Sequence, residues 1–283
     1  MINPISSSDA EPPKLKIYFL PNLLTAGNLF CGFVALTKIV EADIAAGDYG
    51  PIKVALGFIL LACIFDLFDG RVARMGGQDS PFGREFDSLA DLISFGAAPA
   101  FLVHRIVLKD AFGPEYTELG WFIASVYLIC GAFRLARFNC LSAINLPGAG
   151  KDFLGFPIPS AAGLVASLTL FIIKLNENER TLGHWRYLPA VVLVFLSAMM
   201  VSQVRYPSFK SLGLRSTTTF LKVISGALFL GLLLVLREKI IYYVLPLFFT
   251  GYLLYGFVRP HLSRAWRREI EEDDDGDSEA AAS

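Results

Sequence analysis

Long apolar runs constrain this chain more than any other feature of its sequence. Eight runs of about 20 residues each are long enough, as helices, to cross a hydrocarbon core of about 30 Å. Only 18% of the residues are charged, against about a quarter in ordinary soluble domains. The runs are too many and too long for a soluble all-helical protein with a large core. We therefore expect an all-α integral membrane protein, a bundle of about eight transmembrane helices, near residues 18–40, 51–70, 86–108, 120–141, 157–175, 187–204, 218–236 and 239–258.

The basic residues predict how the bundle is oriented. Most of the 25 Lys and Arg residues fall in alternate loops, on the side that also holds both termini. Because cytoplasmic loops carry an excess of Lys and Arg, we expect both termini on the cytoplasmic side of the cell (inner) membrane. The expected organisation is a polar tail at 1–13, one transmembrane domain at 14–268 and an acidic, disordered tail at 269–283.

Two pairs of aspartates lie on either side of the loop between the second and third runs. Asp66 and Asp69 are three residues apart at the end of one predicted span, and Asp87 and Asp91 are four apart at the start of the next. Residues three or four apart share one face of a helix, so each pair forms an acidic stripe. A short cytoplasmic connection between two helices can bring the two stripes face to face at the membrane boundary.

Small residues continue both stripes and leave room for a bulky ligand. Gly70 and Ala73 follow Asp66 at four and seven residues, and Gly83 precedes Asp87 by four. Four converging carboxylates repel one another unless they share a cation, and oxygen-only ligation suits Mg²⁺ or Mn²⁺. The alternative is a set of surface carboxylates paired with the arginines of the same loop. The register of small and acidic residues favours the metal site.

The whole pattern resembles the signature of the CDP-alcohol phosphatidyltransferases. Eight residues stand at the fixed spacings of that signature, although it covers under a tenth of the chain. In this sequence it reads Asp66-x2-Asp69-Gly70-x2-Ala73-Arg74-x8-Gly83-x3-Asp87-x3-Asp91.

The resemblance implies a role for each of these positions. The four aspartates would hold two divalent metal ions, and Asp91 would also act as the general base. Gly70 and Arg74 would contact the CDP-linked lipid, with Ala73 and Gly83 leaving space for it. Further candidates for the same ligand are Ser80, Asn22 and Thr25.

Three other stretches bear on the acceptor alcohol. They resemble the bacterial and archaeal phosphatidylserine synthases within this family, which implies transfer of a phosphatidyl group from CDP-diacylglycerol to L-serine with release of CMP. Glycerol 3-phosphate, inositol phosphate and choline remain open as acceptors. The same resemblance implies membrane lipid as surroundings and a homodimer, and no nucleic-acid partner is expected. The stretches are PNLLTAGNLFCGF (21–33), GREFDSLADLISFGAAPA (83–100) and FRLARFN (133–139).

Two arginines are candidates for binding the serine carboxylate. Arg134 and Arg137 are three residues apart at the cytoplasmic end of an apolar run, so they share a face. The excess of arginine at cytoplasmic helix ends accounts for them equally well, and both interpretations stay open.

A polytopic transporter is the rival class of function, but transporters place their sites near the bilayer midplane. A structural scaffold would give no reason for the spacing of the aspartates.

Overall fold

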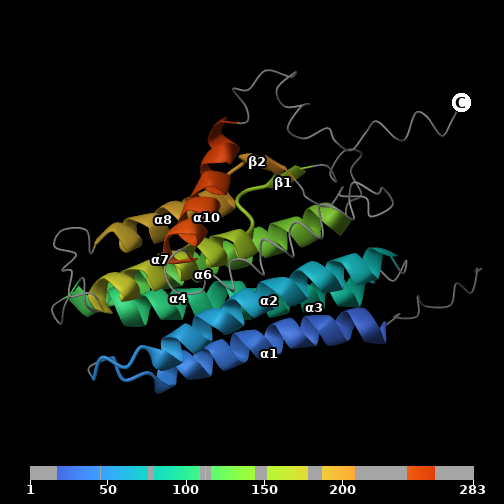
Figure 1. The fold of residues 1–283 in the computed structure, drawn as a ribbon. Helices are drawn as coiled ribbons and strands as arrows, with labels where there is room; N and C mark the ends of the chain where they lie inside the picture. The colour runs from blue at the N-terminus through green and yellow to red at the C-terminus, as the bar shows by residue number, and fades with distance from the viewer. Residues whose placement is uncertain are drawn as a thin grey trace, which may run out of the picture.

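The computed structural model describes residues 18–44, 46–75, 80–108, 112, 116–143, 152–177, 187–207 and 241–258. In these segments the chain forms a helical bundle with a single two-stranded ribbon at one end (Figure 1). The elements are α1 (Phe19–Glu41), α2 (Gly50–Met75), α3 (Pro81–Asp91), η1 (Leu92–Ala97), α4 (Ala98–Val103), η2 (His104–Leu108), α6 (Thr117–Ala143), β1 (Asp152–Leu154), α7 (Ile158–Glu177), α8 (Leu188–Val201), β2 (Arg205–Pro207) and α10 (Ile241–Val258).

Five helices are long and apolar enough to cross a membrane, which confirms the helical membrane class. They match the first five predicted spans: α1, α2, the continuous helix from Pro81 to Leu108, α6 and α7. Two shorter apolar helices, α8 and the central part of α10, fall within the predicted spans 187–204 and 239–258. The predicted span 218–236 lies outside the described residues.

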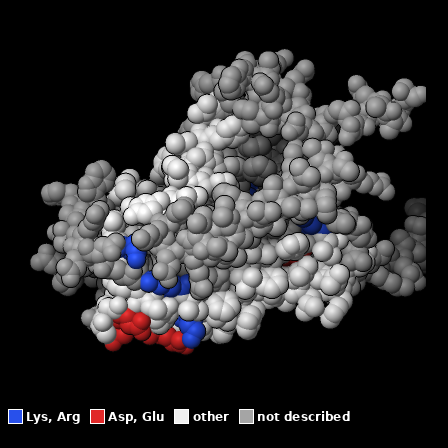
Figure 2. Space-filling view, in the orientation of Figure 1, with Lys and Arg blue, Asp and Glu red and all other residues white. Residues whose placement is uncertain are grey.

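Apolar side chains on the outer faces of these helices fit a bilayer better than water. Phe30 and Phe33 on α1 are 63% and 61% exposed, and Leu67 and Phe68 on α2 are half exposed. A helix with apolar residues on all sides is typical of a membrane span, because lipid tails solvate the face that protein does not cover. Charged side chains gather instead at the end of the bundle that carries the turn between α1 and α2 (Figure 2).

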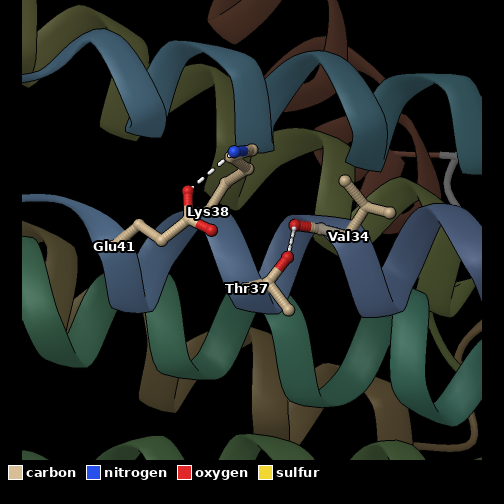
Figure 3. Close-up of polar contacts among 4 residues, drawn as sticks. All are labelled: Val34, Thr37, Lys38 and Glu41. Atoms are coloured by element: carbon tan, nitrogen blue, oxygen red, sulfur yellow. Dashed lines mark hydrogen bonds and ion pairs between the residues drawn. The ribbon is translucent and has the colours of Figure 1, made fainter.

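That end of the bundle is held by local polar contacts. Lys38 donates to Glu41 at 2.6 Å near the end of α1 (Figure 3), an exposed pair of the kind that stabilises a helix only slightly. Arg105 donates to the carbonyl of Ala42 at 2.7 Å and to that of Val40 at 3.2 Å. These carbonyls belong to the last turn of α1 and to the residue that caps it, where the helix has no partners of its own for them. The aspartates of α2 lie at the opposite end of the bundle.

The third membrane helix begins earlier than the apolar pattern predicts. It starts at Pro81 rather than near residue 86, because Ser80 caps it by accepting a hydrogen bond from the Gly83 backbone N–H at 3.0 Å. Proline at the first helical position suits this geometry, since its missing N–H would have no helical partner. Asp87 therefore lies in the second turn of the helix, with its backbone already fixed.

This helix changes its winding directly after Asp91. The π-helical segment η1 follows at once, and such segments recur at functional sites. Tyr127 of α6 donates to the carbonyl of Phe95 at 3.1 Å, and Ser94 donates to the carbonyl of Asn28 on α1 at 2.9 Å. Side chains of η1 and α6 thus hold η1 between its two neighbours.

The contact between Ser94 and the Asn28 carbonyl depends on a close approach of α1 and η1. A Cβ atom added to Gly32 would lie 2.8 Å from the Ser94 Cα and would overlap the Ser94 hydroxyl. Only glycine leaves room for the two backbones to meet at this point.

A ribbon closes the same end of the bundle as the aspartates. Strands β1 and β2 pair antiparallel, with Phe153 opposite Tyr206. The Tyr206 ring packs edge-on against Phe156 at 5.2 Å, and its hydroxyl donates to the Leu253 carbonyl of α10 at 3.3 Å. Burial raises the pKa of Tyr206 to about 12, so the hydroxyl keeps the proton that it donates.

We predict that Gly32→Ala destabilises the protein by about 1–3 kcal/mol, because the added methyl group overpacks the contact with Ser94. Thermal unfolding in detergent measures the loss. Gly57→Ala on α2 is the matched control, since its Cβ would meet nothing within 4 Å. The control should be unchanged or slightly more stable, because alanine favours a helix over glycine. Equal destabilisation of the two variants would contradict the close approach.

Candidate active site

Three of the four predicted aspartates come together at one end of the bundle. Asp66 and Asp69 reach the site from α2, and Asp87 reaches it from α3. One carboxylate oxygen from each lies within 4.8 Å of the other two. Asp69 is 4% exposed, while Asp66 and Asp87 are partly open to solvent. The cluster is therefore accessible from one side and enclosed on the other.

Helix α1 supplies polar contacts to both acidic helices. The Thr25 hydroxyl lies 3.0 Å from the Asp69 Oδ2 and 3.1 Å from the Pro21 carbonyl, and its single proton serves one acceptor at a time. One turn further along α1, Asn28 Nδ2 donates to Asp91 Oδ1 at 3.1 Å. Thr25 thus orients a carboxylate of α2, and Asn28 orients one of α3.

Asp91 stands next to the cluster and is more deeply enclosed than Asp66 or Asp87. It is 6% exposed, and its carboxylate interacts electrostatically with Asp66, Asp87 and Arg134. The buried guanidinium of Arg134 interacts with both Asp91 and Asp66. Asp91 accepts a hydrogen bond from an amide donor as well.

The two candidate arginines have different surroundings. Arg134 is 8% exposed, and its guanidinium interacts electrostatically with Asp91 and Asp66. Arg137 instead donates to backbone carbonyls: to Val201 and Leu154 at 2.8 Å each, to Ser202 at 3.1 Å and to Met200 at 3.2 Å. These contacts cap the end of α8 and join it to β1, as a cation at a helix C-terminus does.

The residues predicted to bind the CDP-linked lipid lie in two places. Asn22, Ser80 and Gly83 are neighbours where α1 meets the start of α3, since a Cβ on Gly83 would lie 3.2 Å from the Ser80 hydroxyl and 3.5 Å from Asn22 Oδ1. Gly70 and Ala73 are on α2 beyond Asp69, half-buried. The backbone of Arg74 continues α2, and its side chain is outside the described atoms.

Comparison with known proteins places this geometry in a family. The profile described as CDP-alcohol phosphatidyltransferase matches residues 18–204. The chain belongs to the CDP-alcohol phosphatidyltransferase family. Every aspartate of the cluster, together with Asn28, Asp91, Arg134 and Arg137, lies inside the matched segment.

Several relatives extend the likeness over most of the chain. The CDP-diacylglycerol–serine O-phosphatidyltransferase of Helicobacter pylori (strain ATCC 700392 / 26695) is 35% identical over 86% of this chain and 91% of its own length. The protein of the same name from Bacillus subtilis (strain 168) is 34% identical over 68% of this chain and 92% of its own length. The archaetidylserine synthase of Methanothermobacter thermautotrophicus is 32% identical over 69% of this chain and 72% of its own length.

The donor set of the cluster fits the divalent metal that this family generally uses. Asp66, Asp69 and Asp87 offer carboxylate oxygens alone, which hard divalent cations prefer. Three carboxylates within 4.8 Å of one another also repel strongly unless a cation is shared between them. These three residues would hold a metal ion, which would neutralise them and polarise the phosphate oxygens of a substrate.

Asn28 is one of two asparagines that the sequence analysis missed. It is fully buried and contacts Asp91, although it stands within the quoted stretch 21–33. The sequence did contain a signal for Asn28, because an amide side chain stands there inside an apolar run. Polar groups in membrane spans are costly and often functional. Asn139 was missed as well: its Nδ2 donates to Glu85 at 3.1 Å and to the Ser88 hydroxyl at 3.0 Å, which ties α6 to α3.

We predict that Mg²⁺ or Mn²⁺ raises the unfolding temperature of the purified protein and that Asp69→Asn abolishes this rise. A ligand that binds only the folded state adds about 2.7 kcal/mol at 100 times its Kd. Thermal unfolding with and without metal measures the effect without any catalytic step. Asp43→Asn, an exposed aspartate after the far end of α1, is the control and should keep the full metal-dependent shift. A shift that survives in Asp69→Asn would argue against the cluster as the metal site.

Proposed function

We propose that this protein transfers the phosphatidyl group of CDP-diacylglycerol to L-serine, giving phosphatidylserine and CMP. The observation that carries the proposal is the convergence of three carboxylates from α2 and α3, next to Asp91 and the buried guanidinium that interacts with it. The alignments with this chain cover up to 92% of the length of the relatives that are named for serine as acceptor. The donor lipid matches the location, because its charged head must stay in water while its acyl chains stay in the bilayer.

The charges around Asp91 favour an amino acid as acceptor over a sugar or glycerol phosphate. Arg134 is the one cation that is buried among the residues whose side chains the structure describes. The guanidinium of Arg137 already has four carbonyl partners. An acceptor phosphate would add up to two negative charges beside three carboxylates, whereas serine has a carboxylate for Arg134 and an ammonium that suits an acidic site.

The proposed chemistry is a displacement at the phosphorus that carries the diacylglycerol. The serine hydroxyl gives its proton to Asp91 and forms a new P–O bond. The bond from this phosphorus to the bridging oxygen breaks, and CMP leaves with that oxygen. Arg134 holds the serine carboxylate, while Asn22, Thr25, Gly70, Ala73, Arg74, Ser80 and Gly83 line the place of the CDP-linked lipid.

Metal ions complete the proposed site. Asp66, Asp69, Asp87 and Asp91 would hold two ions, Mg²⁺ or Mn²⁺. When bound, they would stabilise the charge on the diphosphate as it is cleaved. Asp91 would serve both as a ligand and as the proton acceptor, and its contact with Asn28 fixes the carboxylate for either role.

The same proposal fixes where the reaction occurs. Both termini and the carboxylate cluster face the cytoplasm, and residues 14–268 form the membrane domain as part of a homodimer. The polar tails at 1–13 and 269–283 take no part in the reaction. In this orientation the turn between α1 and α2, with its exposed acidic residues, lies on the opposite side of the membrane.

We predict that the purified protein releases CMP from CDP-diacylglycerol when L-serine is present. Glycerol 3-phosphate, inositol phosphate and choline, offered at the same concentration, should release at least tenfold less. Chelation of divalent metal should stop the reaction, and added Mg²⁺ or Mn²⁺ should restore it. If a phosphate-bearing acceptor released more CMP than serine does, that acceptor would take the place of serine in the proposed reaction.

Asp91→Asn should lower turnover by orders of magnitude and still bind the CDP-lipid better than Asp66→Asn does.

We predict different results for lysine at the two candidate arginines. Arg134→Lys keeps the charge but loses the planar fork that grips a carboxylate, so the KM for serine should rise about tenfold. Arg137→Lys should lower the unfolding temperature, because it cannot serve four carbonyls, and should leave the serine KM within about twofold. Steady-state kinetics with each substrate varied in turn measures both values. A serine KM that changes only in Arg137→Lys would assign the carboxylate to Arg137.

A further inference from the structure

We propose that Asn28 recognises the acceptor itself: its side-chain carbonyl oxygen Oδ1 accepts a hydrogen bond from the α-ammonium of serine. The amide nitrogen of the same side chain holds Asp91. This inference rests on the proposed function and names a specificity residue for it. The planar amide of Asn28 would thus position two groups at once. One is the amino group of the substrate, and the other is the Asp91 carboxylate, which receives the hydroxyl proton.

The hydrogen bonding of Asn28 is half complete in the described structure. Its side chain is fully buried, and Nδ2 donates to Asp91 Oδ1 at 3.1 Å. Its Oδ1 is equally buried and has no hydrogen-bond partner among the described residues. Buried polar atoms are almost always satisfied in folded proteins, so an acceptor left open in this place indicates a donor that arrives with a ligand.

The position of this open oxygen is set by the rest of the amide group. Oδ1 and Nδ2 share one carbon atom, so Oδ1 stays within a few ångströms of Asp91 as long as Nδ2 is bonded to it. The backbone of Asn28 is also fixed, because Ser94 donates to its carbonyl at 2.9 Å where Gly32 lets the two helices touch. The oxygen is therefore held beside the proposed base and cannot turn toward the bilayer without breaking these contacts.

The electrostatics around Asn28 select a cation. Asp91 interacts with two further carboxylates, Asp66 and Asp87, and with the guanidinium of Arg134. An ammonium group beside Asn28 lies next to the carboxylate of Asp91, and Arg134 offers the serine carboxylate a separate partner. The two charged groups of serine then bind on either side of Asp91, which leaves the hydroxyl as the group next to the base.

An inhibitor that lacks only the amino group tests this assignment. 3-Hydroxypropionate keeps the hydroxyl and the carboxylate of serine. In Asn28→Ala we expect the KM for serine to rise at least tenfold. The inhibition constant of 3-hydroxypropionate and the KM for CDP-diacylglycerol should each change by less than twofold. Asn28→Ser, whose side chain is too short to reach, should behave in the same way if the alanine variant folds poorly.

Other outcomes overturn the inference. A fall in kcat with an unchanged serine KM would mean that Asn28 only positions Asp91. Equal weakening of serine and 3-hydroxypropionate would mean that the site has lost its shape. Thr37→Ala is the control on the same helix, because its hydroxyl donates to the Val34 carbonyl of its own helix at 2.8 Å (Figure 3) and should leave every constant unchanged. Wild-type protein that releases no CMP with serine would refute the proposed function, whereas an active wild type with an unaltered Asn28→Ala would refute this inference alone.

Discussion

Carboxylates that share a small space at a membrane boundary repel one another, and much of this bundle serves to keep them together. The i, i+3 spacing of Asp66 and Asp69 puts both on one face of α2, and the capped start of α3 fixes Asp87 opposite them. Helix α1 then supplies a hydroxyl and an amide as hydrogen-bond donors. Such a cluster is stable only when donors and a shared cation offset its repulsion, so the fold and the expected metal depend on each other.

Helix α1 is the element that joins the parts of the site. It contacts α2 through Thr25 and the π-helical segment of the third span through Gly32 and Ser94. The opposite face of its central part is apolar and suits lipid, as the exposed Phe30 and Phe33 indicate. Thr25 and Asn28 lie on the face of α1 that meets the acidic helices, so the contacts that hold the site do not expose polar groups to the bilayer.

The sequence predicted the parts of this structure that depend on local spacing. Hydropathy located five spans, and the intervals between the aspartates predicted that Asp66, Asp69 and Asp87 converge. It could not predict contacts that depend on packing between distant segments. Asn28 meets Asp91 across 63 residues of chain, and the carbonyls that Arg137 caps at the end of α8 are equally far away. The early start of α3 was readable from Ser80 and Pro81, but hydropathy alone places the boundary where the apolar residues begin.

In the proposed site, the residues that bind the donor lipid are distinct from those that select the acceptor. In the proposed reaction the donor lipid presents a diphosphate, which the metal-bearing carboxylates would hold, and the signature residues belong to that half, with Asp91 also serving the acceptor as base. Under the proposed function, the acceptor is distinguished by groups outside the signature that are close enough to Asp91 to contact the alcohol that it would deprotonate. Asn28 and Arg134 are the buried polar side chains that meet this condition among the described residues. Neither lies within the signature segment, so under these proposals a change of acceptor would not require a change of the aspartates.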